Sequence, residues 1–105
     1  MLNKYKERYP DAKWIVLHID PIVLLHADAL FYESNAASSK FKNISEKDLS
    51  STDALINLFS NKIVTKDRFS VREYNSLPNA TTDEQAEIMV KDIVPKEYIL
   101  NWSHL

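Results

Sequence analysis

The chain has 105 residues and a formal net charge of −2, which suits one small domain and lacks the basic excess of a dedicated nucleic-acid binder. It contains no glycine, so P-loop and Rossmann nucleotide sites are excluded, because both need glycine for close backbone approach to phosphates. It contains no cysteine, which excludes disulfides and cysteine-ligated zinc. With no secretory signal and no apolar run of about 18 residues, we expect a cytoplasmic protein without a membrane partner.

Hydrophobic patterning predicts an α+β chain with short helices and four strands. In chain order, the predicted elements are a helix over 2–9, a strand over 14–19, a helical turn over 22–25, a strand over 29–32, a helix over 52–60, and strands over 86–90 and 98–102. Ser45 and Asp48 have the spacing of a capping box, which indicates a further helical stretch. The strand over 14–19 is a nearly continuous apolar run, so we expect it to be covered on both faces.

Two groups of apolar side chains are assigned to the core. In the helix over 52–60, three residues recur at helical spacing and form one apolar face: Leu55, Leu58 and Phe59. Aromatic residues in or beside the predicted strands are interpreted as core residues rather than as a platform for nucleic-acid bases: Trp14, Tyr98 and Trp102.

Residues 61–83 show no sustained period, and we expect them to form a loop that is the most mobile part of the chain. Because glycine is absent, positive φ angles are expected at asparagines, namely Asn35, Asn43, Asn61 and Asn79. Positive charge gathers in the 61–83 region at Lys66, Arg68 and Arg72. These side chains either contact DNA phosphates, with Phe69 or Tyr74 stacking on a base, or belong to an ordinary exposed loop.

The segment Gln85–Lys91 carries the most informative pattern, since Glu87 places a carboxylate at the start of an otherwise apolar strand. Side chains two residues apart in a strand face the same way, so Gln85 and Glu87 are predicted to point together. From these residues alone, Glu87 is either a functional carboxylate or an exposed glutamate on an edge strand, paired with Lys91. Glu84 is assigned to capping the preceding turn with Thr81.

The three histidines lack the spacing of metal ligands, and no metal site is predicted. They are His18, His26 and His104. His18, which lies within a predicted strand, is interpreted as structural.

Three blocks of the sequence together resemble the DarT family of DNA ADP-ribosyltransferase toxins: His18–Asp20, Leu30–Ser38, and Gln85–Val90 followed by Val94-Pro95 and Tyr98-Ile99. The resemblance implies one domain over residues 1–105 with an ADP-ribosyltransferase-like split mixed β-sheet and short flanking helices. It implies that Glu87 is the catalytic glutamate and that Gln85 helps to position the acceptor. NAD would be the substrate that donates ADP-ribose, thymidine in single-stranded DNA the acceptor, and a DarG-like macrodomain antitoxin the partner that reverses the modification.

Members of this family carry an N-terminal part with a histidine and an arginine that grip NAD, and this chain resembles the region that comes after that part. Neither Arg68 nor Arg72 matches the family's arginine by position. We therefore expect an incomplete, C-terminal portion of the catalytic unit. The alternatives are a non-catalytic DNA- or protein-binding remnant, a subunit completed by a partner chain, or a piece that self-associates through exposed apolar surface.

Overall fold

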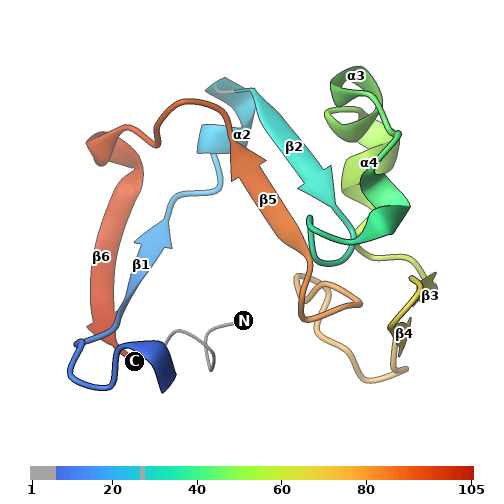
Figure 1. Cartoon of the computed structure of the whole chain (residues 1–105). Coiled ribbons are helices and arrows are strands. Elements are labelled where there is room, and N and C mark those ends of the chain that lie inside the picture. The colour runs from blue at the N-terminus through green and yellow to red at the C-terminus, as the bar shows by residue number, and fades with distance from the viewer. Residues whose placement is uncertain (1–6, 27) are drawn as a thin grey trace. The chain divides into compact units, whose positions relative to one another are not determined.

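The computed structural model describes residues 7–26 and 28–105, and its elements are labelled in Figure 1. The strands are β1 (Ile15–Ile19), β2 (Ala29–Tyr32), β3 (Lys62–Val64), β4 (Phe69–Val71), β5 (Glu87–Val90) and β6 (Ile99–His104). The α-helices are α2 (Val23–His26), α3 (Glu46–Leu49) and α4 (Thr52–Asn57), and single 3₁₀ turns cover Ser39–Phe41 and Lys96–Tyr98. The predicted α+β class is confirmed.

The described strands form three separate two-stranded sheets, β1–β6, β2–β5 and β3–β4, and each pair is antiparallel. By its contacts the chain divides into two compact units. One holds the chain up to Leu25 together with Val94–Leu105 and contains β1–β6. The other is the continuous segment His26–Ile93, which contains the other two sheets together with α3 and α4.

In the first unit, β1 runs from Ile15 opposite His104 to Ile19 opposite Ile99. The expectation that β1 is covered on both faces is wrong, because Ile15 and Leu17 are 49% and 48% exposed. A two-stranded ribbon has no second layer of its own, so an apolar run in it is not thereby buried. Trp102 is likewise not a core aromatic: it is exposed and stacks edge-on against His104, with ring centroids 5.1 Å apart.

The helical predictions within the described residues are confirmed with changed bounds: the turn predicted over 22–25 is α2, one residue later, and the helix predicted over 52–60 is the shorter α4. The Ser45 hydroxyl accepts a hydrogen bond from the Asp48 N–H at 3.2 Å and caps α3, and the Ser51 hydroxyl accepts one from the Ala54 N–H at 3.1 Å and caps α4. α4 ends at Asn57 rather than at residue 60. Of the predicted helix over 2–9, residues 2–6 lie outside the described part; Glu7 and Arg8 are helical.

The core of the second unit lies where α3 and α4 pack against β2. Its buried apolar residues are Ala29, Phe31, Phe41, Leu49, Leu58 and Ile63. Leu58, from the predicted apolar face of the helix, is only 1% exposed. None of the described helices has the length and apolar character needed to cross a membrane.

The region predicted as an unstructured loop contains the hairpin β3–β4, so that prediction is wrong for its first part. The turn between the strands is closed by a hydrogen bond from the Thr65 N–H to the Arg68 carbonyl at 2.9 Å, and the Thr65 hydroxyl accepts from the Arg68 N–H at 3.1 Å. Ile63 is buried at 2% exposure. Strands of three residues are too short to give a measurable alternation, which is why the pattern is weak.

Positive φ also falls elsewhere than predicted. Within the described residues, Asp92, with φ of 66°, is the non-glycine position in the left-handed region, and none of the four asparagines is there. The prediction at the asparagines is therefore wrong; Asp92 follows β5, and aspartate shares asparagine's tolerance of this region.

Candidate functional site

Glu87 is the first residue of β5 and lies opposite Tyr32 of β2. Phe31, the neighbour of Tyr32, points to the face covered by α3 and α4, where it borders a cavity with Leu49 and Ala54. Because alternate residues of paired strands share a face, Glu87 lies on the opposite face. The Glu87 side chain is half-buried, and its Oε1 accepts a hydrogen bond from the Ala36 N–H at 3.4 Å. At that length the bond is weak, so the carboxylate retains most of its capacity to bind another group.

Lys91, the alternative partner proposed for Glu87, is engaged elsewhere. Its Nζ donates to Oε2 of Glu46 on α3 at 3.0 Å. This hydrogen bond and the negative charge of Glu46 raise the pKa of Lys91. Glu87 is therefore not held as a surface ion pair with Lys91.

The Asn35–Ser38 turn supplies the contact to Glu87. The Asn35 side-chain oxygen accepts from the Ala37 N–H at 2.9 Å, and the Asn35 carbonyl accepts from the Ser38 N–H, also at 2.9 Å. This Asx-type arrangement fixes the turn without positive φ and leaves the Ala36 N–H facing Glu87. Three residues of this turn, Asn35, Ala37 and Ser38, also form part of a cavity wall.

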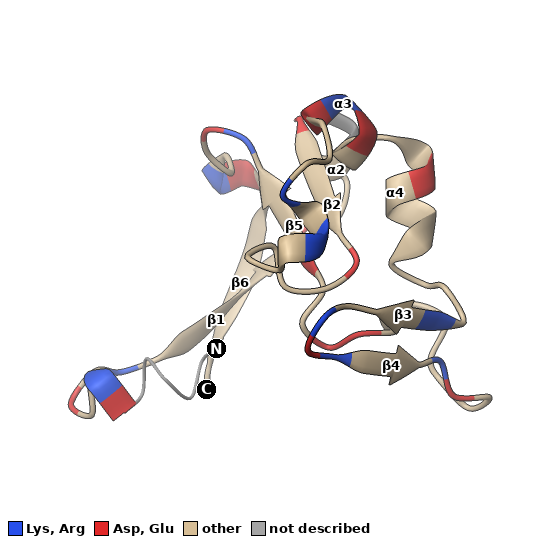
Figure 2. Ribbon diagram, turned by 45° about the vertical axis from the view of Figure 1, so that its right-hand side comes forward, with Lys and Arg blue, Asp and Glu red and all other residues tan. Residues whose placement is uncertain are grey.

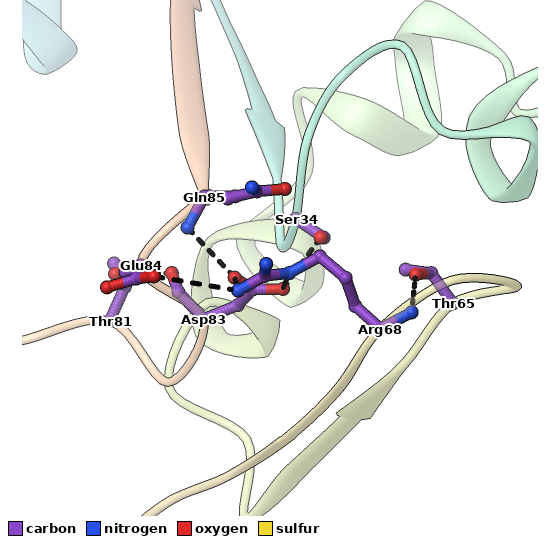
Figure 3. Close-up of polar contacts among 7 residues, drawn as sticks. All are labelled: Ser34, Thr65, Arg68, Thr81, Asp83, Glu84 and Gln85. Atoms are coloured by element: carbon purple, nitrogen blue, oxygen red, sulfur yellow. Dashed lines mark hydrogen bonds and ion pairs between the residues drawn. The ribbon is translucent and has the colours of Figure 1, made fainter. Parts of the chain in front are cut away.

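Asp83 is the centre of a buried polar cluster that the sequence patterns did not reveal (Figure 3). Its side chain is buried, and the residue is 1% exposed. Oδ2 accepts from the Ser34 hydroxyl at 2.7 Å and from Arg68 Nε at 3.3 Å. Oδ1 accepts from Arg68 Nη2 at 3.0 Å and from the Gln85 N–H at 2.8 Å. Three chain segments, after β2, between β3 and β4, and before β5, therefore meet at one carboxylate.

The electrostatics of this cluster favour the charged form of Asp83. Burial by itself acts to raise the pKa of the carboxyl, but the hydrogen bonds from Arg68, Ser34 and the Gln85 N–H, with the Arg68 charge, outweigh it and hold the pKa below its ordinary value. Asp83 therefore remains a carboxylate that keeps the Arg68 guanidinium in a fixed orientation.

Asp83, and not Glu84, also shapes the turn before β5. The Asp83 carbonyl accepts from the Thr81 hydroxyl at 3.0 Å and from the Ala86 N–H, also at 3.0 Å. The Glu84 side chain is 88% exposed and comes only within 4.0 Å of Arg68 Nη2, so its assignment as the cap is wrong. An aspartate whose side chain accepts the N–H two residues on is a recognised turn former, and Asp83 before Gln85 carries that signal.

A cavity of about 210 Å³ opens beside this cluster. Its wall is made of side chains and backbone from the same three segments: Ser34, Asn35, Ala37, Ser38, Thr65, Asp67, Arg68 and Gln85. The lining offers hydroxyls, two carboxamides, a guanidinium and a carboxylate. Such a wall suits a small polar group with both donors and acceptors.

Gln85 and Glu87 stand in different relations to the cavity. Gln85 precedes β5 and borders the cavity, whereas Glu87 reaches the turn through Ala36, between the lining residues Asn35 and Ala37. Because Gln85 lies outside the strand, strand alternation does not govern its direction. Gln85 therefore lines the cavity, whereas Glu87 is joined to the neighbouring turn through the Ala36 N–H, and the strand geometry on which the prediction depended applies to Glu87 alone.

Figure 2 marks in blue the basic positions on and beside the β3–β4 hairpin, and their side chains have different partners. Arg68 pairs with Asp83, and Arg72 donates from Nη1 to the Ala80 carbonyl at 2.7 Å and from Nη2 to the Leu77 carbonyl at 3.0 Å. The Arg72 guanidinium also lies 5.6 Å from the ring centroid of Phe59. Lys66, at the tip of the hairpin, is exposed and has no ion pair or hydrogen bond from its side chain within the described part of the chain. Lys66 is thus the most available cation of the three.

No group of three or more His, Asp or Glu side chains that could hold a metal ion occurs within residues 7–26 and 28–105.

Comparison with protein families identifies a match over almost the whole chain. The family model described as "ssDNA thymidine ADP-ribosyltransferase, DarT" matches residues 1–101, and so extends over both compact units. No curated protein matches the chain.

Proposed function

Because this chain belongs to the DarT family of single-stranded DNA thymidine ADP-ribosyltransferases, we propose that it transfers ADP-ribose from NAD to thymidine, with Glu87 as the catalytic residue. The observation that carries the proposal is the position of Glu87: a weakly bonded carboxylate at the start of β5, beside the wall of a polar cavity. The family match covers both compact units, so we also propose that they belong to one domain.

The chemistry needs a carboxylate in such a place. Breaking the bond between nicotinamide and ribose develops positive charge on the sugar, and a fixed carboxylate nearby stabilises this transition state more than the neutral sugar of the substrate. The same carboxylate accepts the proton of the attacking base nitrogen when the two come within hydrogen-bond reach. A contact of 3.4 Å from one N–H orients Glu87 without using up its negative charge.

Gln85 is proposed to position the acceptor. Its carboxamide carries two N–H donors at the cavity, and the carbonyl groups of thymine can accept from them. The ring N–H of thymine, whose proton Glu87 is proposed to take, then stays free for the reaction. The cavity, at about 210 Å³, is below the 300 to 1,000 Å³ usual for whole ligands. It therefore suits one base or one end of NAD, and the rest of each substrate would lie outside it.

For the DNA strand, the exposed face of the hairpin supplies both kinds of contact that single strands need. Lys62 and Val64 lie opposite Val71 and Phe69, and all four are exposed, with Phe69 at 65%. Aromatic stacking holds bases and lysine binds phosphates. Arg68 and Arg72 are bonded to other groups of the protein and are proposed to hold structure: Arg68 the hairpin, and Arg72 the turn over 77–80, which the Ala80 N–H closes by donating to the Leu77 carbonyl. Lys66 is proposed to bind the DNA strand directly.

We expect Phe69→Ala to weaken binding of a thymidine-rich single strand by about 5- to 100-fold, the usual effect of losing one stacked base. Lys66→Ala is expected to weaken binding less and to reduce the slope of log affinity against log salt by about 0.7. Fluorescence anisotropy at several salt concentrations measures both. Lys47→Ala, at an exposed lysine of α3, is the control; equal losses in all three variants would argue against a hairpin site.

A biological role in a toxin–antitoxin system is proposed for the same chain, with a DarG-like macrodomain as the partner that removes the modification. Family membership supports this role. To test it, DNA that the chain has modified is incubated with a macrodomain hydrolase of that kind, and we expect the hydrolase to remove the ADP-ribose.

The second candidate is a non-catalytic module that binds DNA. Two observations favour it. The cavity is small for a whole dinucleotide, and Arg68 and Arg72 are already bonded to groups of the protein and so are not free to bind the phosphates of NAD. In this candidate the hairpin face and Lys66 still hold the strand.

One experiment separates the two. The full chain is incubated with NAD and single-stranded oligonucleotides that contain or lack thymidine, and the DNA is analysed by mass spectrometry. An ADP-ribose adduct on thymidine, lost in Glu87→Ala, is expected. Absence of any adduct from folded protein that binds the oligonucleotide would exclude autonomous catalysis and leave the binding module.

A further inference from the structure

Asp83 is buried, and its carboxylate accepts four hydrogen bonds from three segments of the chain. Each of its oxygens accepts two hydrogen bonds: Oδ1 from Arg68 Nη2 and the Gln85 N–H, and Oδ2 from Arg68 Nε and the Ser34 hydroxyl. An ionised carboxylate has about four lone-pair sites, so all of them are occupied. Asp83 therefore has no free position for a substrate and is not a candidate for chemistry itself.

The partners of Asp83 are residues that surround the cavity. Ser34, Arg68 and Gln85 all border it, and Figure 3 shows them converging on the Asp83 carboxylate from separate segments of the chain. Gln85 is tied to Asp83 through its own backbone N–H at 2.8 Å, and Ala86 through its N–H to the Asp83 carbonyl at 3.0 Å. The next residue is Glu87.

The contacts of Asp83 thus continue directly into the start of β5. A charge-assisted, bidentate pair is the strongest kind of hydrogen-bonded contact available to these side chains. By comparison, the direct contact that orients Glu87 is a single N–H at 3.4 Å. The place of the Glu87 carboxylate is therefore set mainly through its backbone, by the pairing of β5 with β2 on one side and by the segment that precedes it on the other.

We propose that Asp83 is a positioning residue, which through Gln85 and Ala86 helps to set the place of Glu87, and through Ser34 and Arg68 sets the wall of the cavity that Gln85 borders. This inference rests on the proposed function. It assigns Arg68 to holding the site in place, through a planar fork that lysine cannot reproduce.

Three variants test this role in the full chain. Asp83→Asn keeps the shape of the side chain but removes the charge, and Arg68→Lys keeps the charge but removes the fork. Glu84→Gln is the matched control, because Glu84 is adjacent, acidic and 88% exposed on its side chain. Two measurements are made on folded protein: steady-state transfer of ADP-ribose to a thymidine oligonucleotide, and amide hydrogen exchange by NMR at Gln85 and Ala86.

We expect Asp83→Asn and Arg68→Lys to lower kcat by about 10- to 100-fold with little change in KM for NAD, as displacement of a catalytic group by about 1 Å does. Exchange at Gln85 and Ala86 is expected to accelerate in both variants, and Glu84→Gln to match the wild type in both measurements. Faster exchange with unchanged kcat would overturn the proposal, because Asp83 would then serve stability alone. Unchanged exchange would overturn it as well.

Failure of the proposed function gives a different result. If the wild-type chain transfers no ADP-ribose, the transferase proposal fails, and so does the proposal that Asp83 positions Glu87 for catalysis. Exchange at Gln85 and Ala86 still decides whether Asp83 holds this segment, because that measurement needs neither NAD nor DNA.

Discussion

Replacement of Glu87 by glutamine is expected to lower the rate of ADP-ribosyl transfer by about 100- to 1,000-fold, the usual cost of removing one preorganised electrostatic contact to a transition state. Glutamine keeps the size of the side chain and can still accept the Ala36 N–H, but it carries no negative charge to stabilise the ribosyl cation. Binding of NAD and of the oligonucleotide is expected to change little. Single-turnover kinetics with a thymidine oligonucleotide measure the effect.

The matched control for this variant is Glu84→Gln, which removes the same charge three residues earlier, at an exposed position. Both variants change the net charge of the chain by the same amount, so a general electrostatic effect on DNA binding would lower both rates equally. A Glu87→Gln rate within a factor of about three of the Glu84→Gln rate, far short of the loss expected for a catalytic carboxylate, would show that Glu87 is not catalytic.

Arg68→Ala is expected to reduce the free energy of unfolding at pH 7 by about 2 to 4 kcal/mol, because it leaves the buried Asp83 carboxylate without its cationic partner. The bonds from Ser34 and the Gln85 N–H remain, so the loss stays below the upper end for buried ion pairs. Urea denaturation followed by circular dichroism measures it. Lys66→Ala, at an exposed lysine two residues away, is expected to change the same free energy by less than about 0.5 kcal/mol.

The pH dependence of this difference has a definite sign. In the wild type the pKa of Asp83 lies below its ordinary value of 3.8, so its stabilising contribution is complete above that value and is lost as pH falls through the lower, folded-state pKa. Without Arg68, burial acts to raise the pKa, and protonation relieves the unpaired charge. The difference in the free energy of unfolding between the wild type and Arg68→Ala is therefore expected to become smaller below about pH 4. A difference that stays constant from about pH 7 to about pH 3 would contradict this expectation.

Local sequence signals predicted the elements that depend on local physics. Ser45 caps α3 as predicted, its hydroxyl accepting from the Asp48 N–H, and the strands β2 and β5 form where short apolar runs are clear. Such features need no knowledge of distant residues. The α+β class followed from them.

The parts that were not predicted depend on contacts between distant residues. The hairpin β3–β4 is two three-residue strands, whose formation depends on burying Ile63 rather than on any period. The pair of Arg68 with Asp83 joins residues 15 positions apart, and another partner, Ser34, is 49 positions from Asp83. Charged residues are usually exposed, so a buried carboxylate is recognisable only once its partners are in place.

The division of the chain into two units also has a consequence for the order in which it folds. Among the described strands β1 pairs with β6, and the whole of the second unit, His26–Ile93, is synthesised between them. During translation the apolar β1 must remain without its partner while the continuous unit, with Asp83 and its three partners, becomes complete. During synthesis the ribbon therefore closes last, and until it does, the unpaired β1 is exposed to wrong pairing.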